Sequence, residues 1–178
     1  MCDILAVDAA AQYRQLLQLG RSDFLAAAAP AALVRYRSEM TDETPWPSAA
    51  TLSIDEEIEE TLPHGKDWAP GDVEFELYPV AKKPGASFPD RITIGRIGNN
   101  DIVIPDPSVS RLHAYVRRDG AQWLVADAGS KNGSWLTGEA LDARRERALP
   151  SKAILRLGEV DVTFYVASDL YAALGGTR

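Results

Sequence analysis

Between residues 95 and 134 the chain carries basic, hydroxyl and carboxamide side chains at short intervals. They form four segments: Gly95-Arg96, Asn99-Asn100-Asp101, Ser110-Arg111-x-His113 and Ser130-Lys131-Asn132-Gly133-Ser134. A guanidinium group can hold phosphate oxygens in a fork, a hydroxyl and an ammonium group can complete the shell, and a carboxamide can hold a neighbouring peptide bond. The set therefore suits a ligand that is a phosphorylated peptide.

Short strands separated by turns must position these segments. Apolar residues begin to recur with a period of two at Val73, which is typical of a strand. Further strands are predicted at 91–95, 101–104, 112–117, 122–127, 134–136, 153–157 and 160–166. Hairpin turns are expected at Asp119-Gly120 and Gly158-Glu159, because glycine readily adopts the positive φ that such turns require. Many short strands with frequent turns predict a mainly β fold, a β-sandwich of mostly antiparallel strands.

The N-terminal region has a different pattern. The apolar spacing from Asp3 to Leu19 is approximately helical and ends at Gly20, a natural stop. A second, alanine-rich helix is predicted from Phe24, and Pro30 kinks or ends it. The expected organisation is a helical N-terminal extension over 1–45, an acidic, proline-containing connector over 46–71, the sandwich over 72–167 and a tail over 168–178 with a short helix.

Composition and charge argue against several functional classes. The chain has 178 residues and is 46% hydrophobic and 25% charged, which is globular composition. Residues 1–85 hold 7 Lys and Arg against 15 Asp and Glu, whereas residues 86–178 hold 12 against 11, so there is no basic stripe for nucleic acid. No apolar run approaches the roughly 20 residues that span a bilayer. One cysteine allows no internal disulfide, which fits a cytoplasmic location.

Catalytic and metal-binding patterns are weak. Ser110, His113 and Asp127 could be imagined as a hydrolase triad, but strand positions three apart point to opposite faces and no nucleophile elbow surrounds the serine. Neither a G-x-x-x-x-G-K-[ST] loop nor a G-x-G-x-x-G turn occurs. Two histidines and one cysteine do not support a zinc site. We therefore predict no enzyme, no cofactor and no metal, with a serine hydrolase as the least favoured alternative.

Taken together, the order of the motifs resembles that of the forkhead-associated (FHA) domain. The matching segments are Gly95-Arg96, Ser110-x-x-His113 and Asn132-Gly133, with Asp127 ending a strand before the last loop. The resemblance covers roughly residues 72–167 and implies an FHA-type sandwich that reads phosphothreonine and is not an enzyme. Ser134 stands where the family usually has threonine, and both residues suit the start of a strand.

The resemblance also implies roles for individual residues. The family's first arginine and its serine bind the phosphate, and these roles would fall to Arg96 and Ser110. The positions of Arg111 and Lys131 often add phosphate or peptide contacts, and the position of Asn132 binds the peptide backbone. Without the resemblance, each residue has a plainer interpretation: a surface ion pair for the arginine, a turn cap for the serine and a hairpin turn for Asn-Gly.

Further residues would support the binding loops, namely Gly95, His113 and Gly133. The predicted function is a phosphothreonine-binding adaptor in Ser/Thr-kinase signalling, whose partners are a phosphorylated protein and a kinase. The alternative is an FHA-like scaffold that binds its partners without phosphate. Thr41, Thr44 and Thr51 lie in or near the connector, and their phosphorylation is a hypothetical route to self-association.

Overall fold

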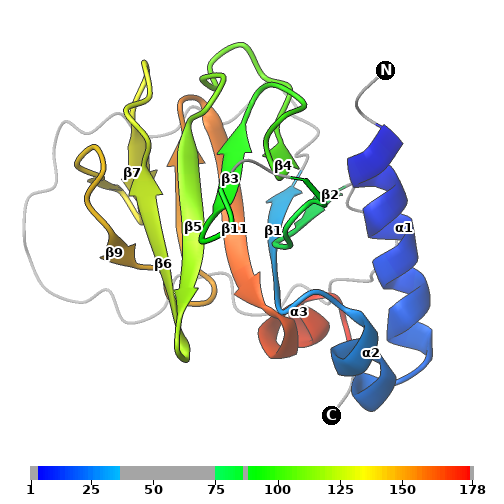
Figure 1. Ribbon diagram of the computed structural model, residues 1–178. Helices are drawn as coiled ribbons and strands as arrows, with labels where there is room; N and C mark the ends of the chain where they lie inside the picture. The colour runs from blue at the N-terminus through cyan, green and yellow to red at the C-terminus, as the bar shows by residue number, and fades with distance from the viewer. Residues whose placement is uncertain (1–3, 37–74, 86–87, 177–178) are drawn as a thin grey trace, which may run out of the picture.

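The computed structural model describes residues 4–36, 75–85 and 88–176, and it contains two β-sheets packed face to face (Figure 1). One sheet has the order β2 (Phe75–Pro79), β1 (Ala31–Tyr36), β11 (Val160–Val166), β10 (Ile154–Leu157), β7 (Ser134–Leu136) and β8 (Glu139–Ala140). The other has the order β4 (Ile102–Val103), β3 (Ile92–Gly95), β5 (Ala114–Asp119), β6 (Gln122–Asp127) and β9 (Arg147–Ala148). Within the described ranges only β3 and β4 pair in parallel. The predicted mainly β sandwich is confirmed.

The predicted hairpins occur where glycine allows them. Gly120 joins β5 to β6 with φ 59°, and Gly158 joins β10 to β11 with φ 64°. Most predicted strands are present with ends shifted by one or two residues. The two-residue strands β8 and β9 were not predicted, because two residues are too few to show a period.

The space between the sheets holds the main hydrophobic core. Alternate residues of the longer strands point into it, among them the fully buried Leu33, Ile94, Val116, Leu155 and Phe164. The rings of Trp123 and Phe164 lie edge to face, with their centroids 5.7 Å apart. Close packing of β-branched and aromatic side chains from both sheets makes this core the rigid base of the connecting loops.

Helices cover the outer face of β1 and β2 and form a second hydrophobic cluster. They are α1 (Ile4–Gln18), α2 (Arg21–Ala27) and α3 (Ala167–Ala173), at the right and bottom of Figure 1. Phe24 of α2 is fully buried there, and its ring lies 5.7 Å from that of Tyr13 and 5.2 Å from that of Tyr171. Among the described residues no helix is long and apolar enough to cross a bilayer.

Strand β1 is a correction to the helical extension that was expected over residues 1–45. Helix α2 ends at Ala27, before Pro30, and the chain then enters the sheet between β2 and β11. Ala31 and Leu33 face the sandwich core, whereas Ala32 and Val34 face the helices. Because both faces are buried there, the first four residues of the strand form a continuous apolar run without alternation. The connector and Thr41, Thr44 and Thr51 lie outside the described residues.

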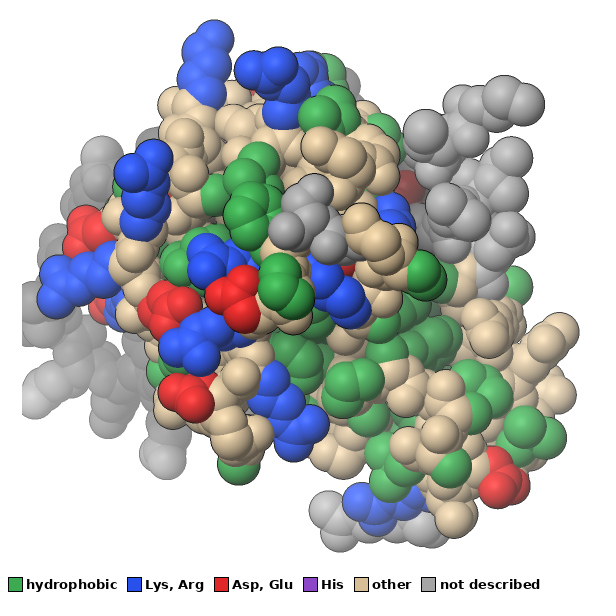
Figure 2. Space-filling model, viewed as in Figure 1, with side chains coloured by type: hydrophobic (Ala, Val, Ile, Leu, Met, Phe, Trp, Pro, Cys, Tyr) green, Lys and Arg blue, Asp and Glu red, His purple; other side chains and the backbone are tan. Residues whose placement is uncertain are grey.

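The outer face of the five-stranded sheet carries interspersed basic and acidic side chains (Figure 2). Arg117 on β5 forms a two-point ion pair with Glu146, with its shorter contact at 2.6 Å. Arg91 lies over the ring of Tyr115, 4.6 Å from its centroid. Most of the charge on this face is therefore balanced by ion pairs. A cation at its edge without such a partner is a candidate to bind an anionic ligand.

Candidate functional site

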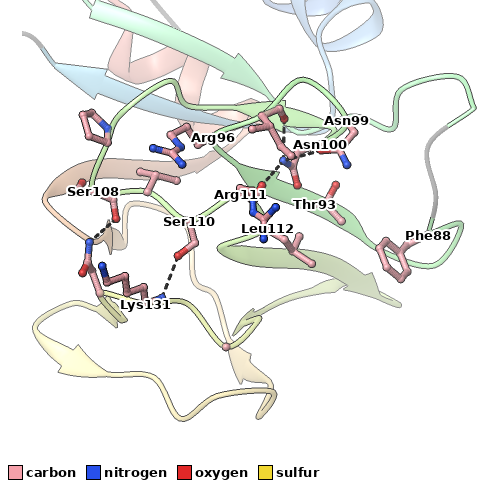
Figure 3. Close-up of a pocket in the computed structure, with 15 residues that line it drawn as sticks. Phe88, Thr93, Arg96, Asn99, Asn100, Ser108, Ser110, Arg111, Leu112 and Lys131 are labelled. Atoms are coloured by element: carbon pink, nitrogen blue, oxygen red, sulfur yellow. Dashed lines mark hydrogen bonds between the residues drawn. The ribbon is translucent and has the colours of Figure 1, made fainter.

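Loops at one rim of the sandwich enclose a cavity of about 810 Å³ (Figure 3). They follow β3, β4 and β6, so three separate chain segments meet there. The five residues predicted to contact a phosphopeptide all line this cavity: Arg96, Ser110, Arg111, Lys131 and Asn132. The structure thus brings together residues that are up to 36 positions apart in the sequence.

Backbone contacts hold the first two loops against each other. The Arg96 N–H donates to the Ser110 carbonyl at 3.0 Å, and the His113 N–H donates to the Ile94 carbonyl at 2.9 Å. A Cβ atom on Gly95 would lie 2.2 Å from the Arg111 carbonyl oxygen, so any side chain there would push the loops apart. Glycine at 95 is therefore required by close approach of the backbone.

The cations that line the cavity are not neutralised. Arg96, Arg111 and Lys131 are exposed, and none of them forms an ion pair with another described residue. No Asp or Glu belongs to the described lining of the cavity. Uncompensated positive charge around a concave surface attracts an anionic ligand.

Polar groups between the cations keep free hydrogen-bonding capacity. The Ser110 Oγ accepts the Lys131 N–H at 2.9 Å, so its hydroxyl proton remains available to a ligand oxygen. The Asn132 Nδ2 donates to the Ser108 carbonyl at 2.8 Å, which leaves the Oδ1 and one N–H for a peptide backbone. These contacts fix both side chains and still leave a donor or acceptor on each.

His113 is buried beneath the rim and braces two loops. Its Nδ1 accepts the Ser110 N–H at 2.9 Å, so the ring proton is on Nε2, which lies 2.9 Å from the Gly133 carbonyl. Burial lowers the pKa of His113 and keeps the ring neutral at pH 7. With both ring nitrogens committed to backbone groups, His113 cannot take a proton from the Ser110 hydroxyl. This arrangement differs from a hydrolase triad.

Asp127 organises the third loop. Its carboxylate accepts the Ser130 and Ser134 hydroxyls at 2.6 and 2.5 Å, together with the backbone N–H groups of Gly129 and Ser130. Burial alone would raise the pKa of Asp127, but these hydrogen bonds outweigh it and hold the pKa below its usual value. Gly133 completes the turn with φ 83°. The loop that presents Lys131 and Asn132 is thus fixed from inside.

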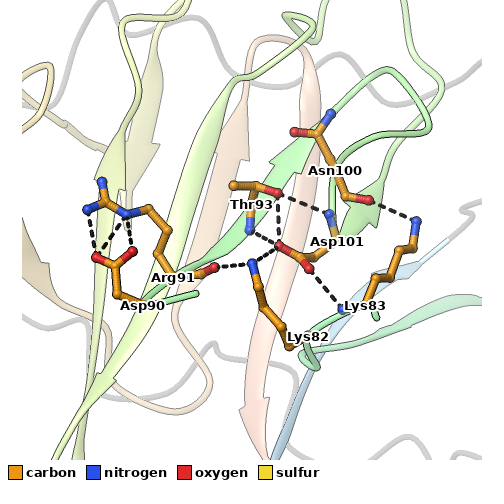
Figure 4. Close-up of polar contacts among 7 residues, drawn as sticks. All are labelled: Lys82, Lys83, Asp90, Arg91, Thr93, Asn100 and Asp101. Carbon is orange, nitrogen blue, oxygen red and sulfur yellow. Dashed lines mark hydrogen bonds and ion pairs between the residues drawn. The ribbon is translucent and has the colours of Figure 1, made fainter. Parts of the chain in front are cut away.

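Two supporting residues received no role from the sequence, namely Asn100 and Asp101. Asn100 is buried, and its Nδ2 donates to the carbonyls of Ile97 and Arg111 at 2.8 and 2.7 Å. Asp101 accepts the Thr93 hydroxyl and N–H and the Lys82 ammonium, each within 2.9 Å (Figure 4). Their position between two polar segments was the only hint of a supporting role in the sequence. Loop residues show no periodicity, so a buried side chain that joins two loops cannot be told from an exposed turn residue.

The described part of the chain groups no three His, Cys, Asp or Glu side chains as metal ligands. The polar groups at the rim are guanidinium, ammonium, hydroxyl and carboxamide groups. Each of them can donate a hydrogen bond to an anionic oxygen.

Comparisons with known proteins find similarity to FHA domains. An FHA domain-containing protein of Arabidopsis thaliana is 36% identical over 78 residues, which is 43% of this chain and 19% of the relative. The glycogen accumulation regulator GarA of Mycolicibacterium smegmatis is 41% identical over 49 residues, which is 28% of this chain and 31% of GarA. A solved FHA domain of an Arabidopsis thaliana hypothetical protein is 22% identical, with TM-score 0.44, over 78% of this chain and 86% of that one.

In each of these curated relatives the match spans less than half of the relative's length. The family model for the FHA domain matches residues 92–158, which include β3 to β10 and all three loops of the rim. That range holds every residue for which the sequence predicted a phosphopeptide contact. The part of this chain that forms the rim therefore matches the FHA domain family.

Proposed function

We propose that this chain is a non-catalytic adaptor that binds phosphothreonine peptides in cytoplasmic Ser/Thr-kinase signalling. The observation that carries the proposal is the cavity at the rim, where unpaired cations from separate loops surround a serine hydroxyl with no acid among the described lining residues. A phosphothreonine brings about −1.5 to −2 charge at pH 7 and three strong acceptor oxygens. The rim offers the complementary charge and donors.

Each group has a distinct part in the proposed complex. Arg96 would hold two phosphate oxygens with its guanidinium fork, while Ser110 would donate its free hydroxyl proton to a third. Arg111 and Lys131 would add positive charge on either side of the phosphate. Asn132 would pair with the peptide backbone and so fix the direction of the bound chain.

The expected affinity follows from the number of contacts. Hydrogen bonds to charged groups contribute roughly 1.5–3 kcal/mol each. Ordering a flexible peptide offsets part of this gain. Several such bonds then give a free energy of binding of about −8 kcal/mol, which corresponds to micromolar affinity. Burial of the extra methyl of threonine adds only about 0.8 kcal/mol, roughly fourfold, so a preference over serine must also use the stiffer β-branched side chain.

Calorimetric titration with a phosphothreonine peptide and its unphosphorylated twin tests the proposal. We expect Arg96→Ala to weaken phosphopeptide binding by about 100-fold or more, because it removes two charge-assisted hydrogen bonds. Arg96→Lys should recover part of the loss, since lysine keeps the charge but not the fork. Arg118→Ala is the matched control, because Arg118 is an exposed arginine of β5 whose side chain, among the described residues, bonds only to the Gly120 carbonyl.

The phosphate-independent scaffold predicts a different result. In that case the wild-type protein would bind the phosphorylated and unphosphorylated peptides equally, and Arg96→Ala would have no more effect than Arg118→Ala. Equal affinities would therefore overturn the proposal, whatever their absolute value.

A further inference from the structure

A second cavity of about 510 Å³ opens beside the rim, on the outer face of the five-stranded sheet. It shares Phe88, Thr93 and Leu112 with the first cavity, so the two cavities adjoin. Figure 3 shows these residues on the side of the rim that lies away from Ser108 and Lys131. A peptide bound at Ser110 can therefore extend along this face without leaving the surface.

The walls of the second cavity are mainly apolar. Leu112 and Phe88 are 40% and 42% exposed, which is high for large hydrophobic side chains. Arg91 is stacked on Tyr115 at 4.6 Å and on Phe88 at 5.7 Å, while its charge is paired with Asp90 at 2.7 Å. The stack therefore presents aromatic and aliphatic surface rather than free charge, which suits an apolar side chain of a ligand.

One unpaired cation borders this apolar surface. Arg144 is exposed and forms no ion pair with a described residue, whereas its neighbour Arg145 pairs with Asp142 at 3.4 Å. The Arg144 N–H donates to the Asp127 carbonyl at 2.7 Å, and φ at this residue is 64°. Since the Asp127 carboxylate also holds the loop with Lys131, Arg144 is tied to the rim.

We infer that the second cavity is a recognition subsite for the flank of the phosphopeptide. It takes an aliphatic side chain between Leu112 and Phe88, and an acidic residue next to that side chain faces Arg144. This inference rests on the proposed phosphopeptide function and adds a sequence preference to it. An extended peptide advances about 3.3 Å per residue, so the subsite reads positions close to the phosphothreonine.

A peptide series in calorimetric titration tests the apolar part. The probes are short peptides with a central phosphothreonine in an alanine–serine background, with one leucine moved through each flanking position. We expect one position at which leucine tightens binding by about 3- to 10-fold over serine. Leu112→Ser should abolish that gain and leave the serine peptide unaffected. Ile154→Ser is the control, because Ile154 is 50% exposed and lies on β10, away from the cavity.

The acidic part is tested with aspartate placed on either side of the preferred leucine. We expect one placement to tighten binding by about threefold at low salt, and Arg144→Asn to remove the gain. Asparagine tolerates the positive φ at this position, so the variant keeps the backbone. Arg145→Asn is the control.

The outcomes separate this inference from the function on which it rests. Strong phosphate dependence with no leucine preference, or with a preference that Leu112→Ser leaves intact, overturns the subsite alone. Equal binding of the phosphorylated and unphosphorylated peptides by the wild-type protein overturns both the subsite and the proposed function. A preference that Leu112→Ser removes and Ile154→Ser retains supports the subsite.

Discussion

The recognition rim and the helical layer lie on different parts of the sandwich and are held together by different forces. At the rim, buried side chains of His113, Asp127 and Asn100 bond to backbone groups of neighbouring loops. In the layer, α1, α2 and α3 pack apolar side chains around Phe24. The rim therefore depends on directional hydrogen bonds, and the layer depends on buried area.

Ligand affinity and folding stability therefore depend on different regions of the molecule. Hydrogen bonds fix loop positions to within tenths of an ångström, which a phosphate fork requires. Apolar packing has no such directionality, but it contributes most of the free energy of folding. Changes in the layer should therefore alter the fraction of folded protein, and changes at the rim should alter the affinity of the folded protein.

The two regions are linked through Arg35 of β1. Its guanidinium lies 3.8 Å from the carboxylate of Asp106, in the loop after β4, and 3.6 Å from that of Glu76. Asp106 in turn accepts the Ser108 hydroxyl at 2.7 Å, and Ser108 accepts Asn132. A chain of polar contacts thus runs from the strand under the helices to the rim.

The largest expected effect is on the layer. Phe24→Ala should lower the free energy of unfolding by about 3–5 kcal/mol, because it removes a fully buried ring that packs against Tyr13 and Tyr171. Chemical denaturation measures this loss. Below the unfolding transition, phosphopeptide affinity should remain within about twofold of the wild-type value.

Leu25→Ala is the matched control for that variant. Leu25 is adjacent in α2 but 40% exposed, so its loss should cost less than about 1 kcal/mol. A Phe24→Ala protein that is folded but has lost phosphopeptide binding would contradict the separation of the two regions.

An intermediate effect is expected at the rim for Asn100→Ala. The variant removes the side-chain donor to the carbonyls of Ile97 and Arg111, and only Ile97 keeps a bond, from the backbone N–H of residue 100. The loss should cost about 1–3 kcal/mol in stability. Because the Arg111 backbone also loosens, phosphopeptide binding should weaken several-fold by calorimetric titration. Gln122→Ala is the control and should alter neither quantity appreciably, because Gln122 is an exposed carboxamide at the start of β6, outside the cavity lining. If the two variants had the same stability and the same phosphopeptide affinity, Asn100 would not support the site.

The smallest effect is expected at the link. Arg35→Gln should cost no more than about 1 kcal/mol, since the side chain is 32% exposed and its ion pairs are long. Phosphopeptide affinity should change by less than about twofold. The control is Arg156→Gln, which removes an exposed pair with Asp161 at 4.0 Å. A tenfold loss of affinity in Arg35→Gln alone would show that β1 sets the geometry of the rim.

Much of the sandwich could be predicted because its signals are local. Strand alternation and the turn glycines at 120 and 158 depend on residues that are neighbours in the chain. Strand β1 could not be predicted in this way. Its run Ala31-Ala32-Leu33-Val34 is buried on both faces, and without alternation it resembles the end of an alanine-rich helix.

The site shows the same division. Residue types and their order show which groups are present: two arginines, a serine, a lysine and an asparagine, in an order that resembles a known family. The folded structure adds that these groups line one cavity, that His113 has both ring nitrogens occupied and that Asn100 joins two loops. The reason is physical: residue types specify what each group can bind, whereas distances between loops depend on how two sheets pack, which involves contacts between residues far apart in the chain.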